Sequence, residues 1–128
     1  MSNLNLSRPT DAELAILRVL WSRGPSTVRQ VHEALSRDRE TGYTTVLKFM
    51  QIMTEKGLVE RDESERTHVY QARFTQEATQ QRLVSDLLEK AFGGSASQLV
   101  MQALAAKPAS ADELAQIRQL LDELEGGK

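Results

Sequence analysis

Hydroxyl, cationic and amide side chains are concentrated in one short segment of the sequence, the run Tyr43-Thr44-Thr45 followed by Lys48 and Gln51. Threonine hydroxyls and the free backbone amides of a helix start bind phosphate oxygens or base edges. Lys48 follows one helical turn later, and the Gln51 side chain has the geometry for a paired contact to adenine. The segment therefore predicts contacts to nucleic acid, although a helix cap and a solvated helix face would use the same residue types.

A second cationic group consists of Arg61, Arg66 and His68. An arginine in this polar stretch can form two parallel hydrogen bonds to phosphate oxygens. Acidic residues at positions 60, 62, 63 and 65 weaken the local positive field. Arg66 is the stronger candidate for a DNA contact than Arg61, and its alternative role is a surface arginine paired with these acids.

Residue patterns that would support catalysis or metal binding are missing from the sequence. The chain has no cysteine, and its two histidines, His32 and His68, do not have the spacing of metal ligands. It also lacks a serine nucleophile motif, a phosphate-binding glycine loop and a zinc-protease motif. We therefore expect no catalytic residue, no metal and no cofactor, and we predict that the protein is not an enzyme.

Aromatic residues make up only 5% of the chain and are not clustered. A base-stacking surface would require a cluster of them. Together with the methionines they are better suited to filling the protein interior. We interpret the following side chains as core or wing-packing residues: Trp21, Tyr70, Phe74, Met50, Met53 and Met101.

Three helices are expected to position the first cationic group. A capping box at Thr10-Asp-Ala-Glu13 begins the first helix, and Gly24-Pro25 ends it because proline cannot continue the hydrogen-bond ladder. A second capping pair, Thr27 and Gln30, begins a short second helix. The third helix runs from Thr44 to Lys56 and is followed by a helix-stopping glycine.

Two short β-prone runs follow the third helix, at residues 58–61 and 68–72. The polar residues 62–67 between them are typical of a hairpin tip. Three helices followed by a hairpin make a winged helix-turn-helix, so the fold class is mainly α with a small α+β wing. Residues 1–75 are predicted to form a winged-helix DNA-binding domain.

From residue 76 the sequence changes to helix-forming residues, interrupted by Gly93-Gly94 and by Pro108. Each expected helix carries an apolar stripe, yet this part of the chain is short for a core of its own. Since such stripes need a partner, we predict that residues 76–128 form the helical dimerisation domain of a homodimer; the alternative is packing onto the winged domain of the same chain. The stripe residues are Leu83, Leu87, Leu88, Leu99, Val100, Leu104, Leu114, Ile117, Leu120, Leu121 and Leu124.

The charge of the chain is nearly balanced: 128 residues include 16 Lys and Arg against 18 Asp and Glu, a net charge of −2. This balance argues against holding a polyanion by bulk charge alone. Residues 1–75 carry a net charge of +1 and residues 76–128 a net charge of −3, so an anion-binding surface belongs to the first part. No apolar run suits a membrane span or a secretion signal, and we expect a soluble, cytoplasmic protein.

Three of these segments resemble the penicillinase repressor family (BlaI/MecI/CopY): Thr10-Asp-Ala-Glu13 leading to Val19-Leu-Trp21, Tyr43-Thr-Thr-Val-Leu-Lys48, and Glu55-Lys-Gly-Leu-Val59. The resemblance spans almost the whole chain. It implies a homodimeric transcriptional repressor that binds a palindromic double-stranded DNA operator through an N-terminal winged helix and dimerises through a helical C-terminal region. In the wing, Glu65-Arg66 stands where the family often has Gly-Arg.

The resemblance also implies how DNA is released. Family members that respond to β-lactams are cut at an Asn-Phe pair in the dimerisation region after a signal from a membrane-bound zinc protease. Alignment on Gly93-Gly94 and Leu99-Val100 places Gln102-Ala103 at that position, which makes this pair the candidate cleavage site. The copper-responsive branch carries paired cysteines near its C-terminus, and their absence here excludes thiolate metal sensing.

Two other functions stay open on the sequence alone. A winged helix can act as a protein-interaction adaptor without sequence-specific DNA binding, and the acidic second part of the chain is compatible with that role. A regulator that senses a small molecule is a third alternative, although the sequence shows no cluster of polar residues converging on an apolar pocket. The operator sequence, the regulated genes and the inducing signal are not predicted.

Overall fold

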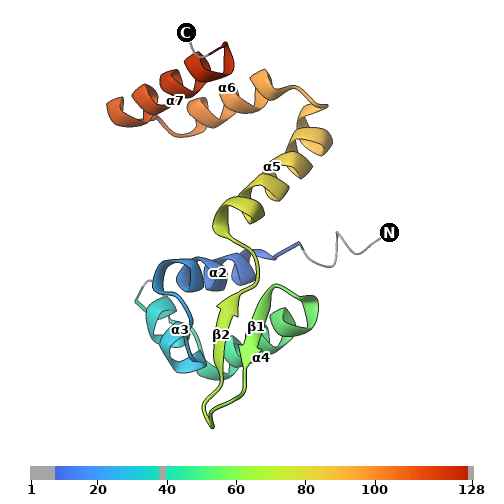
Figure 1. The fold of residues 1–128 in the computed structure, drawn as a ribbon, viewed down its shortest axis with the longest axis vertical. Coiled ribbons are helices and arrows are strands. Elements are labelled where there is room, and N and C mark those ends of the chain that lie inside the picture. Colours follow the sequence, from blue (N-terminus) through green and yellow to red (C-terminus); the bar gives the residue numbers. More distant parts are fainter. Residues whose placement is uncertain (1–7, 38–39, 127–128) are drawn as a thin grey trace. The chain divides into compact units, whose positions relative to one another are not determined.

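The computed structural model describes residues 8–37 and 40–126. Within these ranges the chain forms helices and one antiparallel hairpin (Figure 1). It divides into two compact units, Met1–Leu83 and Val84–Lys128. The elements in chain order are α2 (Asp11–Arg23), α3 (Val28–Leu35), α4 (Tyr43–Lys56), β1 (Val59–Asp62), β2 (Val69–Ala72), α5 (Gln76–Phe92), α6 (Ala96–Ala106) and α7 (Ala111–Leu124).

The helix starts lie where the capping residues predicted them. The Thr10 hydroxyl accepts a hydrogen bond from the Glu13 amide at 3.2 Å, and the Glu13 carboxylate accepts one from the Thr10 amide at 2.9 Å. Thr27 and Gln30 make the same reciprocal pair at the start of α3. These bonds satisfy amides that have no partner inside the helix, so each capping box fixes where its helix begins.

The core of the first unit lies between α2, α3, α4 and the hairpin. Its members are buried apolar side chains, and they include two of the three methionines predicted as core residues, Met50 and Met53. They are Ile16, Leu17, Leu20, Val28, Val31, Val46, Met50, Met53, Leu58, Val59 and Tyr70. The consequence for α4 is that one face is fixed against this core while the opposite face is left to the solvent.

The hairpin is held on both sides of β2. β1 pairs with β2 in an antiparallel register that places Arg61 opposite Tyr70. On the other side of β2, Ser26 and Tyr70 exchange two backbone hydrogen bonds of 2.8 and 2.9 Å. Tyr70 is only 2% exposed and fills the core. Three helices with this hairpin form a winged helix, which confirms the predicted fold class.

A buried ion pair joins the start of α2 to the end of α4. The Lys56 ammonium lies 2.7 Å from the Glu13 carboxylate, and the side chain of Glu13 is 3% exposed. The same carboxylate oxygen also accepts the Thr10 amide of the capping box. Gly57 then ends α4 in the left-handed conformation, with φ of 82°, as the sequence predicted.

The three C-terminal helices, of which α5 begins in the first unit and ends in the second, differ from α2–α4 because they bury almost nothing. None of α5, α6 and α7 contains a buried residue among those that the structure describes. Met101 is 67% exposed, so its prediction as a core residue was wrong. No helix within the described ranges is both long and apolar enough to cross a bilayer.

Phe74, between β2 and α5, was also predicted to pack inside and is 38% exposed instead. Its ring is contacted by two guanidinium groups, those of Arg73 and Arg82, at 5.4 and 5.7 Å from the ring centre. Its backbone oxygen accepts a hydrogen bond of 3.0 Å from the Trp21 indole. The cations thus cover part of a ring that the core does not reach.

Candidate nucleic-acid interface

The polar stripe predicted on the third helix lies on the solvent face of α4. Thr44, Thr45, Lys48 and Gln51 are all exposed, and Tyr43 is 44% exposed. The opposite face carries Val46, Met50 and Met53, which are buried. The helix therefore presents its hydroxyl, ammonium and amide groups together along one side, as a helix that enters a DNA groove must.

The start of α4 leaves its first backbone amides without a side-chain cap. The N-cap residue is Gly42, which makes no capping hydrogen bond, and the helix begins at Tyr43, one residue earlier than predicted. Neither Thr44 nor Thr45 caps the helix, so their hydroxyls stay on its surface. Uncapped amides at the positive end of a helix dipole favour a phosphate oxygen as their partner.

His32 of α3 supports this helix start from behind. Its Nε2 atom lies 2.7 Å from the Thr41 carbonyl oxygen, which can only accept, so Nε2 carries the proton and donates. The imidazole also packs edge to face on the Tyr43 ring, with 5.7 Å between the ring centres. One side chain of α3 thus holds both the turn before α4 and the first residue of α4.

A cleft of about 420 Å³ brings Tyr43 of α4 together with two of the residues predicted on the hairpin. Tyr43 lies on one wall, Arg66 and His68 lie on the hairpin side, and the first turn of α3 contributes Thr27 and Arg29. Arginines from two elements, Arg29 of α3 and Arg66 of the hairpin, thus meet beside the start of α4. Such an arrangement can bind phosphates on either side of a groove while the helix itself lies in the groove.

Arg29 is a candidate interface residue that the sequence analysis missed. It is exposed and lies in the first turn of α3, immediately after the Thr27 cap. A cation at this end of a helix is opposed by the helix dipole and brings no local benefit. That mismatch was the available signal in the sequence, because a residue that is unfavourable for its own helix needs another reason to be there.

Arg61 occupies a different place from Arg66. It lines a separate hollow beside Pro25 and Gln71, and its Nε atom pairs with the Glu63 carboxylate. Hydrogen bonds to the Tyr70 hydroxyl and to Glu63 raise the pKa of the Arg61 guanidinium above its ordinary value. The structure therefore does not bring Arg61 into the cleft with Arg66.

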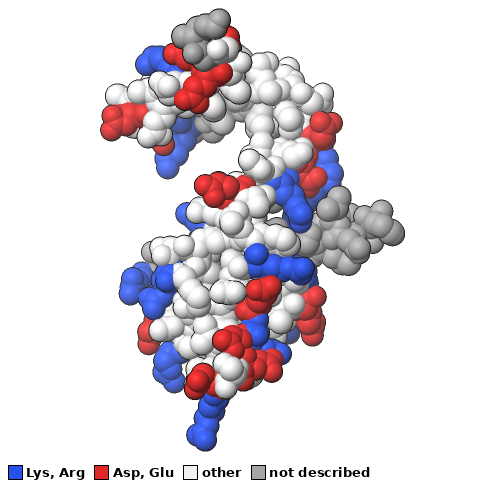
Figure 2. Space-filling model, viewed as in Figure 1, with Lys and Arg blue, Asp and Glu red and all other residues white. Residues whose placement is uncertain are grey.

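The tip of the hairpin is exposed and carries charges of both signs (Figure 2). The Asp62 carboxylate accepts a hydrogen bond of 2.9 Å from the Ser64 amide and a second one from the Ser64 hydroxyl. These two hydrogen bonds lower the pKa of Asp62. Arg66 makes no ion pair with any of the residues that the structure describes. The turn that follows β1 thus shapes the tip and leaves the Arg66 cation available to an external anion.

The residues predicted for dimerisation lie on helices that cover little of their apolar surface. Leu124, the most open of them, is 74% exposed. The half-buried members of the set are Leu83, Leu88, Leu99, Leu114 and Ile117, and the exposed members are Leu87, Val100, Leu104, Leu120, Leu121 and Leu124. Gln102 and Ala103, the candidate cleavage pair, are exposed inside α6.

Comparison with known proteins gives a consistent result. The sequence model of the family described as "Penicillinase repressor" matches residues 9–123. Two curated relatives are both named "Transcriptional regulator BlaI" and come from Mycobacterium tuberculosis, strains CDC 1551 / Oshkosh and ATCC 25618 / H37Rv. Each is 37% identical to this chain over 123 residues, which cover 95% of this chain and 88% of the relative. A solved complex structure of hsRosR-S4 has a TM-score of 0.51 at 17% identity, covering 98% of this chain and 97% of that one, which supports the fold.

Proposed function

We propose, since the chain belongs to the penicillinase repressor family, that it acts as a homodimeric repressor that binds a palindromic DNA operator. The family consists of transcriptional repressors, so the chain is a transcriptional regulator and not an enzyme. The observation that carries the proposal is the exposed stripe of α4 beside a cleft lined by cations from two other elements. We place the protein in the cytoplasm, because a bacterial-type repressor has to reach the DNA that it binds.

In the proposed complex, α4 lies in the major groove. Thr44, Thr45 and Gln51 face the base edges, whereas Lys48 and the uncapped amides of the first turn bind phosphates. Arg29, Arg66 and His68 grip the backbone on the two sides of the groove. Arg61 would join them only when its contact with Glu63 opens or is shared with a phosphate.

The dimer is proposed from the apolar surface of α5–α7. Three helices without a buried residue expose leucines at helical spacing, including Leu120, Leu121 and Leu124. Exposed apolar surface of this extent is typical of an interface. A second copy related by a two-fold axis would cover the same patch on both chains. We propose that the two α4 helices of this dimer bind two operator half-sites about 34 Å apart.

DNA binding is tested by selecting inverted repeats from a random library with the purified chain and measuring affinity across salt concentrations. The expected logarithmic salt slope corresponds to about six to ten phosphates per dimer. Lys48→Ala and Arg66→Ala should each weaken binding, whereas Arg18→Ala, an exposed arginine outside the cleft, serves as the matched control. Failure to retain any inverted repeat at low salt would favour the protein-interaction adaptor.

The dimer is tested by light scattering after gel filtration. Leu121→Glu introduces a charge into the proposed interface and should shift the mass from two chains to one at micromolar concentration. Gln116→Glu adds the same charge to an exposed polar position of the same helix and should leave the dimer intact. A wild-type protein that stays monomeric would refute the proposed dimer.

Release from the operator is proposed to follow cleavage between Gln102 and Ala103 by a membrane-bound zinc protease, because this pair aligns with the family's cleavage site. Both residues are exposed, yet they lie within α6, and a protease cleft accepts an extended backbone. Cleavage therefore requires local unwinding of α6. The chain should be co-expressed with a membrane-bound zinc protease encoded by an adjacent gene and then analysed by mass spectrometry. We expect a fragment that ends at Gln102, and a cut elsewhere would refute this site.

A further inference from the structure

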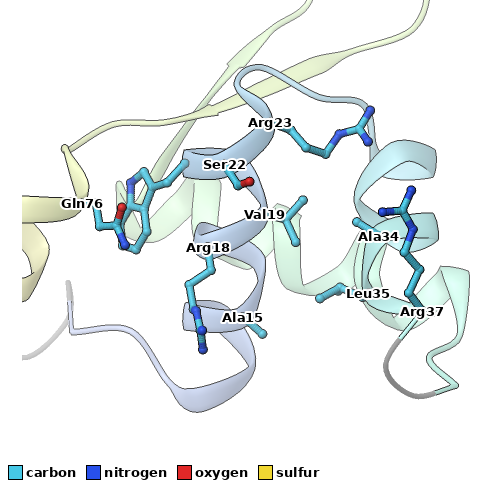
Figure 3. A pocket seen from close by; sticks show the side chains of 10 residues that line it. Ala15, Arg18, Val19, Ser22, Arg23, Ala34, Leu35, Arg37 and Gln76 are labelled. Atoms are coloured by element: carbon cyan, nitrogen blue, oxygen red, sulfur yellow. The ribbon is translucent and has the colours of Figure 1, made fainter. Parts of the chain in front are cut away.

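A second hollow of the first unit lies along α2 and α3 and has a volume of about 520 Å³ (Figure 3). Its walls come from the middle and end of α2, from the end of α3 and from the first residue of α5. None of its lining residues belongs to α4 or to the hairpin. We name this hollow the arginine groove, and it shares no residue with the cleft of the candidate interface.

Three arginines, Arg18, Arg23 and Arg37, give the groove a strong positive charge. No carboxylate lines it, although acidic residues are common in this chain. Within residues 8–37 and 40–126, none of the three guanidinium groups forms an ion pair or a side-chain hydrogen bond. Three exposed donors without an acid suit an anionic ligand that accepts two or more charge-assisted hydrogen bonds.

Apart from Ser22 and Gln76, the rest of the groove is apolar. Figure 3 shows Val19 of α2 and Ala34 and Leu35 of α3 facing one another between the two helices. Arg23 and Arg37 lie on the side of α3, and Arg18 extends from α2 on the opposite side. The half-buried Trp21 completes the wall. A bare inorganic anion would leave this apolar surface in contact with water, whereas a ligand with an apolar body would cover it.

From this combination we infer that the arginine groove binds a small organic anion, a carboxylate or phosphate attached to an apolar body. The volume falls within the range of about 300–1,000 Å³ that is typical of small-molecule sites. Because α4 and the hairpin do not line the groove, such a ligand and DNA can be bound at the same time. The inference goes beyond the proposed repressor function and does not depend on it.

The chain contains its own reporter for this site, because Trp21 is its only tryptophan and lines the groove. We would titrate the full chain with 4-phenylbutyrate, whose phenyl ring does not interfere with tryptophan emission. Inorganic phosphate supplies the charge without the body, and 4-phenylbutanol supplies the body without the charge. We expect a saturable change in emission with 4-phenylbutyrate, and at least about tenfold weaker binding of each comparator.

Variants assign the signal to the groove. Arg18→Ala, Arg23→Ala and Arg37→Ala should each weaken 4-phenylbutyrate binding by about tenfold, as expected for one charge-assisted contact. Arg29→Ala, which removes an exposed arginine from the cleft instead, should leave the affinity unchanged. Equal affinities for all four variants, or a full response to phosphate alone, would overturn the inference.

A final measurement separates the groove from the DNA interface. The titration is repeated with a saturating inverted-repeat duplex, and we expect 4-phenylbutyrate to bind to the DNA complex. Displacement of the probe by the duplex would assign the groove to DNA and overturn the inference. The titration without DNA stands by itself, so a chain that fails to bind an operator can still bind the probe, and the two proposals fail separately.

Discussion

Replacing Arg29 with alanine should affect folding stability and DNA affinity in opposite directions. The side chain is exposed and makes no ion pair among the described residues, so its removal breaks no salt bridge of the folded protein there. Alanine is a better helix former, and losing a cation from the first turn of α3 relieves an unfavourable interaction with the helix dipole. We expect the free energy of unfolding to rise by a few tenths of a kcal/mol.

The DNA affinity of the same variant should fall. One phosphate contact by an exposed arginine contributes about 1 kcal/mol, and a dimer loses two, which corresponds to roughly 30-fold weaker binding. Each lost contact lowers the logarithmic salt slope by about 0.9, so the dimer should lose about 1.8. The weakening should be similar for all operator sequences because phosphates carry no sequence information.

The assay is fluorescence anisotropy with a labelled inverted repeat at several salt concentrations, combined with urea unfolding of the free protein. Arg18→Ala is the matched control, since it removes an exposed arginine of the same unit that does not line the cleft. An unchanged slope for Arg29→Ala, or an equal change for Arg18→Ala, would show that the cleft does not bind the DNA backbone.

Three further predictions concern contacts that position the interface. Lys56→Met leaves the buried Glu13 carboxylate without its cation and should destabilise the fold by about 1–3 kcal/mol in urea unfolding; Lys56→Arg should retain most of the stability, and equal losses would contradict this role. His32→Ala removes the support of Tyr43 and should weaken operator binding about tenfold at little cost in thermal stability, whereas an unchanged affinity would mean that the helix start needs no such support. Because the pKa of Asp62 is lowered, its contribution to folding stability is present above the ordinary carboxyl pKa and is lost as the pH falls through the lowered value. An NMR titration should show the protonation of Asp62 as a chemical-shift change of the Ser64 amide. A change centred at the ordinary carboxyl pKa would contradict the prediction.

Much of the winged unit could be predicted because local residues determine it. Thr10 and Thr27 fix helix starts through bonds that span only three residues, and Gly57 supplies the left-handed conformation that ends α4. The stripe of α4 follows from helical periodicity alone. Lys48 and Gln51 therefore lie on the solvent face, as predicted for a recognition helix.

The cleft and the arginine groove could not be predicted in the same way, because they depend on which helix ends meet. Arg29 and Arg66 come from elements far apart in the sequence, and only the packing of the hairpin beside α3 brings them into one cleft. From the sequence we expected no cluster of polar residues around an apolar pocket. In the structure, however, Arg18 and Arg37 both line the arginine groove together with apolar side chains. Helical periodicity identified Met101 as apolar, but it could not tell whether another chain or a core would cover it.

The double hydrogen bond between Ser26 and Tyr70 has a consequence for how the wing can evolve. It makes β2 the central strand of a minimal three-stranded arrangement, so a slip by one residue would break pairs on both edges and turn the Tyr70 ring out of the interior. Insertions and deletions can therefore be accommodated only at the tip, in residues 63–68. Related proteins that read different operators can vary the length and charge of that tip while the base of the hairpin keeps its alignment.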